Sequence, residues 1–191
     1  MDLGDSFNPN YFSLPDILAS HVRVPCKTEV PLMHFGFLDP ALASEDLPAN
    51  ISTELPLWAA QVMSKANRKY VTAELPKLYK ESYRDALKAD PGVVDLNKMS
   101  PNFYQSGLHL STLNHREAEE VGAILPTVLQ VRLRSMADSF LYETKLKTAD
   151  DENGVSGLKE SHMDALEHKI FEDSKKSYKS LLSWLEKPAT T

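Results

Sequence analysis

The stretch REAEEVGAILPTVLQVRLRSMADSFLYE, residues 116–143, carries the longest periodic pattern in the chain. Apolar residues recur along it at intervals of three or four, at Leu125, Leu129, Leu133, Met136 and Phe140, and the stripe is widened by Val121, Ile124 and Val128. This spacing places them on one face of an α-helix. So broad a stripe predicts a central helix buried on more than one side. Pro126 is expected to bend this helix or to mark its real beginning.

Helical patterns continue on both sides of this segment. Residues 147–157 read as a hydrophilic loop, and residues 158–187 as a last helix whose apolar positions are Met163, Leu166, Ile170, Leu181 and Leu185. Toward the N-terminus, helical segments with short loops begin at residue 54. Because consecutive helices joined by short loops form bundles, the sequence predicts a mainly α fold with a helical bundle over residues 54–187.

The tripeptide Glu-Leu-Pro occurs twice, at residues 54–56 and 74–76. We interpret both copies as helix starts. Thr53 is predicted to cap the first helix, and Pro56 and Pro76 to lie in a first turn, where a missing N–H costs little. Nothing else recurs at this period, which excludes a solenoid.

The N-terminal part differs in composition from the rest. Its first 53 residues hold seven acidic and two basic residues, a net charge of −5, and seven of the 12 prolines lie within the first 56 residues. Alternation over residues 21–24 predicts a strand, which Pro25 is expected to restrict to a sheet edge or a strand end. We predict a small β-containing module over residues 1–38 and a linker over residues 39–53. So short a module buries too little surface to fold alone, so it should lean on the helical part or on another protein.

Catalytic and nucleotide-binding motifs are absent from the sequence: it has no G-x-S-x-G, no P-loop and no G-x-G-x-x-G. The single cysteine, Cys26, allows no internal disulfide and favours a reducing compartment. The six histidines lack metal-ligand spacing. Residues 149–160 match four EF-hand positions, but Ala149 stands where the first ligand belongs, so a solvated turn is preferred to a calcium site. We expect no enzyme, no cofactor and no metal. No signal peptide and no membrane-spanning stretch are predicted either, so we expect a soluble intracellular protein.

Two groups of side chains are candidate binding residues. A basic run comprises Lys65, Arg68, Lys69, Lys77, Lys80 and Arg84. It forms either the solvated face of a helix or an electrostatic contact with an acidic protein or with nucleic acid. The second group comprises Trp58, Tyr79, Tyr83, Met99, Phe103 and Tyr104. These residues belong either to the core or to a subunit interface, where tryptophan and tyrosine are enriched.

Four stretches of the chain resemble one known family. YFSLPDIL (11–18), ELPLW (54–58), ELPKLY (74–79) and ADPGVVDLNKMSPNFY (89–104) occur in this order and at these distances in the Psf-three subunit family of the GINS DNA-replication complex. The similarity runs from about residue 11 to about residue 185 and is strongest over residues 54–104.

This resemblance implies a helical A-type domain preceded by a small β-rich B-type domain, in one of four related subunits of a heterotetramer. It implies a non-catalytic scaffold that joins the hexameric minichromosome-maintenance motor to a RecJ-like Cdc-type protein in the CMG helicase of the nucleus. DNA contact would be indirect or weak, and the second residue group would anchor the core to the subunit interface. The main alternative is a stand-alone nucleic-acid-binding helical protein that uses Lys65–Arg84. A third is an unrecognised enzyme.

Overall fold

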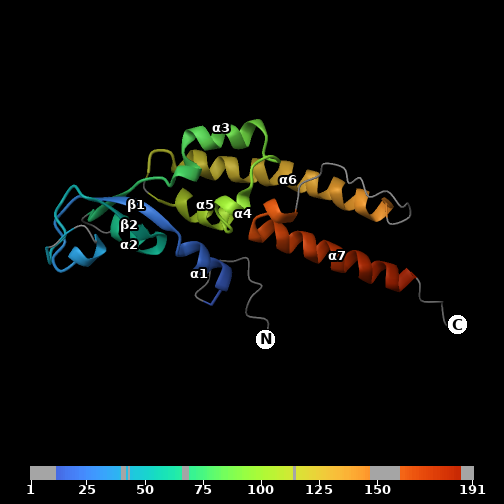
Figure 1. Ribbon diagram of the computed structural model, residues 1–191, viewed down its shortest axis with the longest axis horizontal. Coiled ribbons are helices and arrows are strands. Elements are labelled where there is room, and N and C mark those ends of the chain that lie inside the picture. The colour runs from blue at the N-terminus through green and yellow to red at the C-terminus, as the bar shows by residue number, and fades with distance from the viewer. Residues whose placement is uncertain are drawn as a thin grey trace.

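The computed structural model describes residues 12–39, 42, 44–65, 69–113, 115–146 and 160–185 (Figure 1). Its elements are, in order, α1 (Leu14–Ser20), β1 (Arg23–Thr28), the 3-10 turn η1 (Gly36–Leu38), β2 (Ser52–Pro56), α2 (Leu57–Lys65), β3 (Val71–Ala73), η2 (Lys77–Tyr79), α3 (Glu81–Ala89), α4 (Leu96–Met99), α5 (Phe103–Ser111), α6 (Ala118–Leu146), η3 (Glu160–His162) and α7 (Ala165–Leu185). A small sheet lies at one end of an elongated molecule, and α6 and α7 extend toward the other. The predicted mainly α fold with a small β-containing N-terminal module is confirmed.

The sheet has three antiparallel strands in the order β2-β1-β3. β1 is therefore the central strand, and the expectation that Pro25 confines it to an edge is wrong. Pro25 is opposite Glu54 of β2, and on the other side its carbonyl accepts a hydrogen bond from the N–H of Glu74 at 2.8 Å. The N–H of a strand residue points to the same neighbour as its C=O. The donor that Pro25 lacks is thus missing only beside Glu74, one residue beyond the end of β3.

The two Glu-Leu-Pro copies flank β1 rather than start helices. Residues 54–56 end β2, and α2 begins only at Leu57, so the prediction that Thr53 caps a helix with Pro56 in its first turn is wrong. Residues 74–76 extend from β3 and precede η2, so Pro76 is not in a helix either. In both copies the glutamate is exposed, the leucine buried and the proline half-buried. The recurrence is a strand pattern of period two, repeated on the two sides of one central strand.

Sheet and helices share one hydrophobic core. The same cluster of buried residues includes Val24 of β1, Leu55 of β2 and Val71 of β3 together with Leu110 of α5 and Val121 of α6. The N-terminal module thus rests on the helical part. Residues on both sides of position 53 also belong to one sheet. The division into 1–38, 39–53 and 54–187 remains a prediction.

α6 is the central helix, and it runs unbroken from Ala118 to Leu146 with Pro126 inside it. Pro126 therefore does not begin the helix. Its ring lies on the exposed side, where water can hydrogen-bond the carbonyl that a proline leaves without a donor. α5 packs closely on the buried side, because Gly107 leaves room there: a Cβ at this position would lie 2.9 Å from Leu125 and 3.0 Å from Tyr79.

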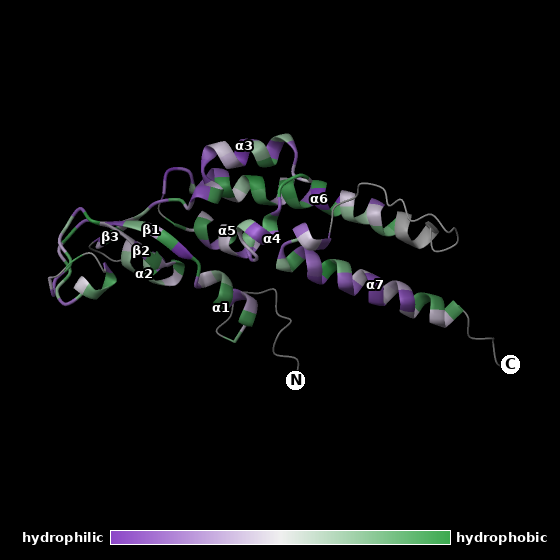
Figure 2. Ribbon diagram, viewed as in Figure 1, coloured by the Kyte–Doolittle hydropathy of each residue, from purple (hydrophilic) through white to green (hydrophobic). Residues whose placement is uncertain are grey.

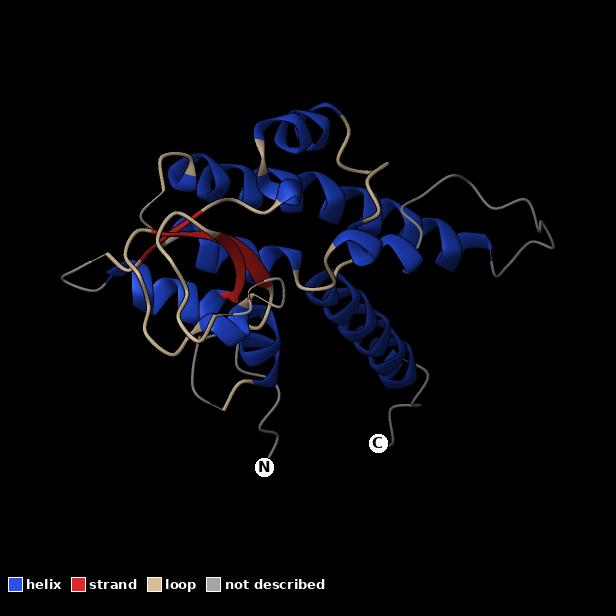
Figure 3. Ribbon diagram, turned by 60° about the vertical axis from the view of Figure 1, so that its left-hand side comes forward, coloured by secondary structure: helices blue, strands red, loops and turns tan. Residues whose placement is uncertain are grey.

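α7 packs on the rest of the chain only along its first half. A second, smaller cluster joins Met136 of α6 to Met163 and Phe171, with Phe140 packed against it. Beyond this cluster α7 leaves the helical core, as the rotated view makes clear (Figure 3). Leu181 and Leu185, predicted on the buried stripe, are exposed. The bundle predicted from the sequence is therefore incomplete at this end.

Candidate subunit interface

Three of the six predicted anchor residues lie in the chain's own core. The rings of Tyr79 and Phe103 stack at 5.2 Å between centroids, and Tyr104 meets Phe103 edge-on at 5.1 Å. The Tyr79 hydroxyl donates a hydrogen bond to the Phe103 carbonyl at 2.7 Å. Burial raises the pKa of both tyrosine hydroxyls well above its ordinary value, so they remain donors. These side chains shape a surface from beneath and present no area of their own to a partner.

The other three predicted residues reach solvent. Trp58 of α2 is 50% exposed, one helical turn before Val62, which is also exposed. Tyr83 of α3 and Met99 at the end of α4 are each 40% exposed. Both of the latter line a groove, so the structure brings two of the predicted anchors together and leaves Trp58 apart from them. That they contact another subunit remains a prediction.

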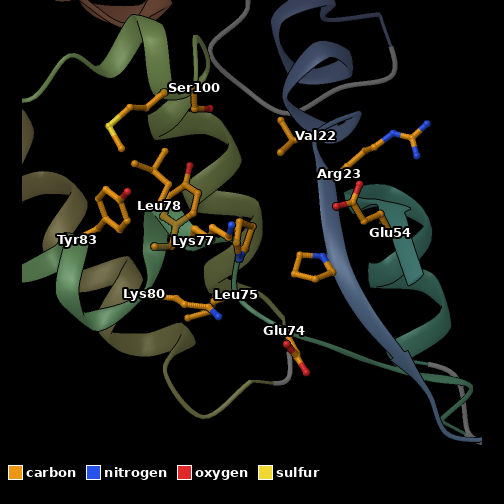
Figure 4. Close-up of a pocket in the computed structure, with 14 residues that line it drawn as sticks. Val22, Arg23, Glu54, Glu74, Leu75, Lys77, Leu78, Lys80, Tyr83 and Ser100 are labelled. Atoms are coloured by element: carbon orange, nitrogen blue, oxygen red, sulfur yellow. The ribbon is translucent and has the colours of Figure 1, made fainter. Parts of the chain in front are cut away.

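The groove lies between the sheet and the turn that leads into α3 (Figure 4). Val22, Arg23 and Glu54 lie along one side, and residues 74–80 with Tyr83 and Ser100 form the other. Its volume is about 600 Å³. The lining combines apolar side chains with Arg23, Lys77 and Lys80 and with Glu54 and Glu74. Charges of both signs beside apolar surface are typical of the rim of a protein interface and do not form a basic track for a polyanion.

The largest cluster of exposed apolar side chains on one helix is at the end of α7. Its members recur at helical spacing and are Tyr178, Leu181, Leu182, Trp184 and Leu185. Trp184 is 69% exposed. The hydropathy view shows this end of α7 as apolar and clear of the neighbouring elements (Figure 2). Tryptophan, tyrosine and leucine on an unpartnered helix face make up a surface that other proteins cover. The stripe predicted from the sequence included Leu181 and Leu185 but missed Trp184 and Tyr178, although their spacing signals the same face.

A buried arginine fixes where α7 begins. Arg132 of α6 is completely buried and uses all five of its N–H donors. Two go to the carboxylate of Glu167 in α7, at 2.7 and 2.9 Å. The other three go to the carbonyls of Pro91 at 2.6 Å, Val94 at 2.9 Å and His162 at 2.9 Å. One side chain thus ties α6, α7 and the turn before α4 together.

Carboxylates complete this network on the α7 side. Glu167, also fully buried, accepts from the Tyr104 hydroxyl at 2.6 Å and from the N–H of Asp164 at 3.1 Å. Asp164 in turn accepts from the N–H of Phe103 at 2.9 Å and of Leu166 at 3.2 Å, so it caps α7. Burial raises the pKa of the Asp164 carboxyl to about 7.

The sequence carries two signals for this network that the apolar periodicity alone does not reveal. Asp-Ala-Leu-Glu at residues 164–167 is the spacing of a capping box, and Arg132 interrupts the apolar row from Val128 to Met136.

The basic run does not form a continuous cationic surface. Arg84 is 3% exposed and donates to Glu117 and Glu120, at 2.7 Å each, and to the Tyr79 carbonyl at 2.8 Å. The Arg84 hydrogen bond holds the pKa of the Glu117 carboxyl below its ordinary value. Arg68 lies outside the described residues. Among those described, the run is reduced to exposed lysines that include Lys77 and Lys80.

Groups that could support catalysis or metal binding are occupied by other contacts where the structure describes them. Burial raises the pKa of the Cys26 thiol to about 12, so it is no nucleophile at neutral pH. Glu160, His168 and Glu172 come close together at the surface, but the ammonium of Lys175 already lies between both glutamates, at 3.5 and 3.2 Å. The remaining positions of the EF-hand-like loop, 149–159, lie outside the described residues. Within the described helices, no segment is apolar and long enough to cross a membrane.

The fold and its exposed helix end define a class: a mainly α-helical protein that presents apolar helix surface of the kind found on subunits of larger assemblies. Comparison with known proteins then gives the family. A family model for the PSF3 N-terminal domain matches residues 12–65, and one for the GINS complex protein helical bundle domain matches residues 78–186. The chain belongs to the PSF3 family of GINS complex proteins.

Curated relatives agree with the two family models. The DNA replication complex GINS protein PSF3 of Xenopus laevis is 33% identical over 175 residues, covering 92% of this chain and 80% of the relative. The Homo sapiens protein of the same name is 33% identical over 183 residues with the same coverage. The Gibberella zeae protein is 29% identical over 189 residues and is covered over 99% of its length. The resemblance drawn from the four sequence stretches is confirmed.

Proposed function

We propose that this chain is a non-catalytic subunit of the heterotetrameric GINS complex in DNA replication, and that it acts there as a scaffold and activator of the CMG helicase in initiation and elongation. Family membership across most of the chain supports the subunit role. The proposal places the protein in the nucleus, with three sister subunits as its immediate partners. The hexameric minichromosome-maintenance motor and the RecJ-like Cdc-type protein are its partners in the larger helicase, and its contact with DNA is indirect or weak.

The observation that carries the proposal is the exposed apolar face at the end of α7. Full burial of one large apolar side chain contributes about 1.5–3 kcal/mol. Leu181, Trp184 and Leu185 together therefore have several kcal/mol to gain from a partner. The fully bonded Arg132 network holds the base of α7 in place. A fixed helix with an uncovered apolar face is suited to packing against helices of a sister subunit.

Three smaller exposed sites are assigned to the same role. Trp58 would anchor a contact at α2, and Tyr83 and Met99 would do so along the groove. Tyr79, Phe103 and Tyr104 act on this surface only through the shape of the core beneath it. Under this proposal the helical domain makes the sister contacts, and the N-terminal module is an appended unit that shares its core.

Co-expression with the three sister subunits, followed by size-exclusion chromatography, tests the proposal. We expect the wild-type chain to elute in one peak with all three sisters. The double variant Leu181→Ser, Trp184→Ser should fail to join them while it retains its far-UV circular dichroism spectrum. Val93→Ser is the matched control, because Val93 is an equally exposed apolar residue away from α7. Normal assembly of the double variant, or a wild-type chain that stays monomeric beside its sisters, would refute the proposal.

The alternative of a stand-alone nucleic-acid-binding protein receives less support. Arg84, the arginine of the predicted basic track that is described, is bound to two glutamates within the chain. The groove beside Lys77 and Lys80 also carries Glu54 and Glu74. Strong binding of fork DNA by the isolated chain, lost on charge reversal at Lys65, Arg68 and Lys69, would restore that alternative. An enzyme would need turnover that depends on one histidine or aspartate.

A further inference from the structure

A loop at the sheet end of the molecule has an unusually constrained backbone. We define the tip loop as residues 31–39 and 44–47. Its two arms are joined by backbone hydrogen bonds between Leu32 and Leu47 in both directions, at 2.8 and 2.9 Å, and from Gly36 to Glu45 at 2.8 Å. A Cβ on Gly36 would overlap the carbonyl oxygens of Ser44 and Glu45. The arms therefore approach so closely that only glycine fits at this position.

His34 holds the bend of the tip loop in a strained conformation. Its φ angle is +62°, a left-handed value that is rare for a residue with a side chain. Two acidic side chains stabilise it: Asp46 accepts from the His34 N–H at 2.8 Å, and Glu45 lies 2.7 Å from the ring Nδ1. Strain that neighbouring groups hold in place is concentrated at functional sites in proteins.

This backbone turns apolar side chains outward. Met33 is 74% and Phe37 75% exposed, while Phe35 is partly exposed and stacks on Phe37 at 5.9 Å between centroids. These three residues are the apolar tip. Leu32 and Leu47, next to them in the loop, are buried. The loop thus has its own small buried base and still presents two phenylalanines to solvent.

The charge around the apolar tip is of one sign. From residue 28 to residue 64 the chain contains no lysine and no arginine, but it contains Glu29, Asp39, Glu45, Asp46 and Glu54. Side chains that project this far need a concave partner surface, and acidic groups around them favour lysine and arginine on its rim. The tip loop lies at the end of the molecule opposite the end of α7 (Figure 1). A partner there does not compete with sisters bound on α7.

We infer that the tip loop docks its apolar tip into an apolar pocket rimmed by lysine and arginine, on a protein outside the GINS tetramer. This inference rests on the proposed function, because it assumes that the α7 face is covered by sisters. Phe35 and Phe37 fill the pocket, and Glu45 faces its basic rim.

The test uses the assembled tetramer and two purified probes, the hexameric minichromosome-maintenance motor and the RecJ-like Cdc-type protein, each immobilised separately. Three tetramers are compared with the wild type: Phe35→Ser with Phe37→Ser, Glu45→Lys, and the control Val93→Ser. For one of the two probes, the double serine variant should bind about tenfold more weakly or worse, and Glu45→Lys should bind several-fold more weakly. Wild-type affinity for that probe should fall as salt rises. The control should bind like the wild type.

Other results distinguish the remaining occupants of the apolar tip. If both probes bind all the tetramers equally, the inference is wrong. If the serine variant fails to assemble, the tip faces a sister subunit. If it differs from the wild type only in self-association or in flotation with phosphatidylcholine vesicles, the occupant is a second copy or a lipid surface. Each of these results overturns the inference. Failure of the wild-type chain to assemble would instead overturn the proposed function.

Discussion

Replacing Arg132 by methionine should destabilise the protein more than any other single change in α6 that keeps a side chain of similar length. Methionine preserves much of the volume and removes the charge and all five donors. It leaves Glu167 ionised and fully buried, with only the Tyr104 hydroxyl and the Asp164 N–H as hydrogen-bond donors. It also leaves the carbonyls of Pro91 and His162 without the donor that Arg132 supplies.

The magnitude follows from what remains behind. Removal of one partner of a buried ion pair costs about 3–5 kcal/mol, because the other charge stays in the interior. A domain is stable by only about 5–15 kcal/mol in total. Arg132→Met should therefore remove a large part of the free energy of unfolding, and the loss should be concentrated where Glu167 and His162 lie. We expect α7 to detach from the core before α5 and α6 unfold.

Urea unfolding of the full chain, followed by far-UV circular dichroism, measures the loss. Hydrogen–deuterium exchange locates it, and protection should fall first in residues 160–175. Arg134→Met is the matched control, since Arg134 lies on the exposed side of the same helix. Its free energy of unfolding should stay within about 0.5 kcal/mol of the wild type.

A double variant separates the ion pair from its surroundings. In Arg132→Met with Glu167→Met no uncompensated charge is left, so the combined loss should be smaller than the sum of the two single losses by at least about 1 kcal/mol. If Arg132→Met costs no more than Arg134→Met, or if the two single losses simply add, then Arg132 does not hold α7 through this ion pair.

Three further predictions test other parts of the network and the core. Burial raises the pKa of Asp164 above its unfolded value, so its contribution to stability is full below about pH 4 and is lost as the pH rises to about 7; Asp164→Asn should flatten that dependence in unfolding experiments, and an unchanged slope would contradict it. Arg84→Met should cost less than Arg132→Met in the same urea assay, because Glu117 and Glu120 reach water; an equal loss would refute this. Gly107→Ala gains up to about 1 kcal/mol of helix propensity but overpacks α5 against α6 at about 1–3 kcal/mol, so thermal unfolding should show a net loss, and a stabilised variant would show that the two helices are not in tight contact.

Periodicity predicted the long helix because α6 is buried by contacts that follow its own pattern. Val121, Ile124 and Val128 are buried as the stripe requires. The same reasoning failed at Glu-Leu-Pro, where proline was read as a helix start. Short strands and helix starts both tolerate proline and both follow polar turns. Only the pairing of β2 and β3 with β1 decides between them, and that pairing is a long-range contact that a local pattern does not contain.

The site was predicted less well than the fold, for a related reason. Aromatic side chains that suit an interface also suit a core, and Tyr79, Phe103 and Tyr104 lie in the core. The helical stripe of α7 was visible in the sequence. Where that stripe ceases to be covered was not, because coverage depends on the length of α6 and on the direction in which α7 leaves it. Arg132 and Glu167 were missed because charged residues are rarely buried unless paired, and the pair is separated by 35 positions.

Two exposed apolar surfaces at opposite ends of one molecule matter for a scaffold only if they are rigidly connected. The connection here consists of buried contacts: the sheet that carries the tip loop shares its core with α5 and α6, and Arg132 joins α6 to the first turn of α7. A partner on α7 therefore fixes the direction in which the tip loop points. It follows that Arg132→Met should impair contacts made through the tip loop even within a tetramer that still assembles. Loss of Phe35 and Phe37, by contrast, should leave the sister contacts at α7 intact. The two kinds of variant thus distinguish a rigid connector from a protein with two independent binding surfaces.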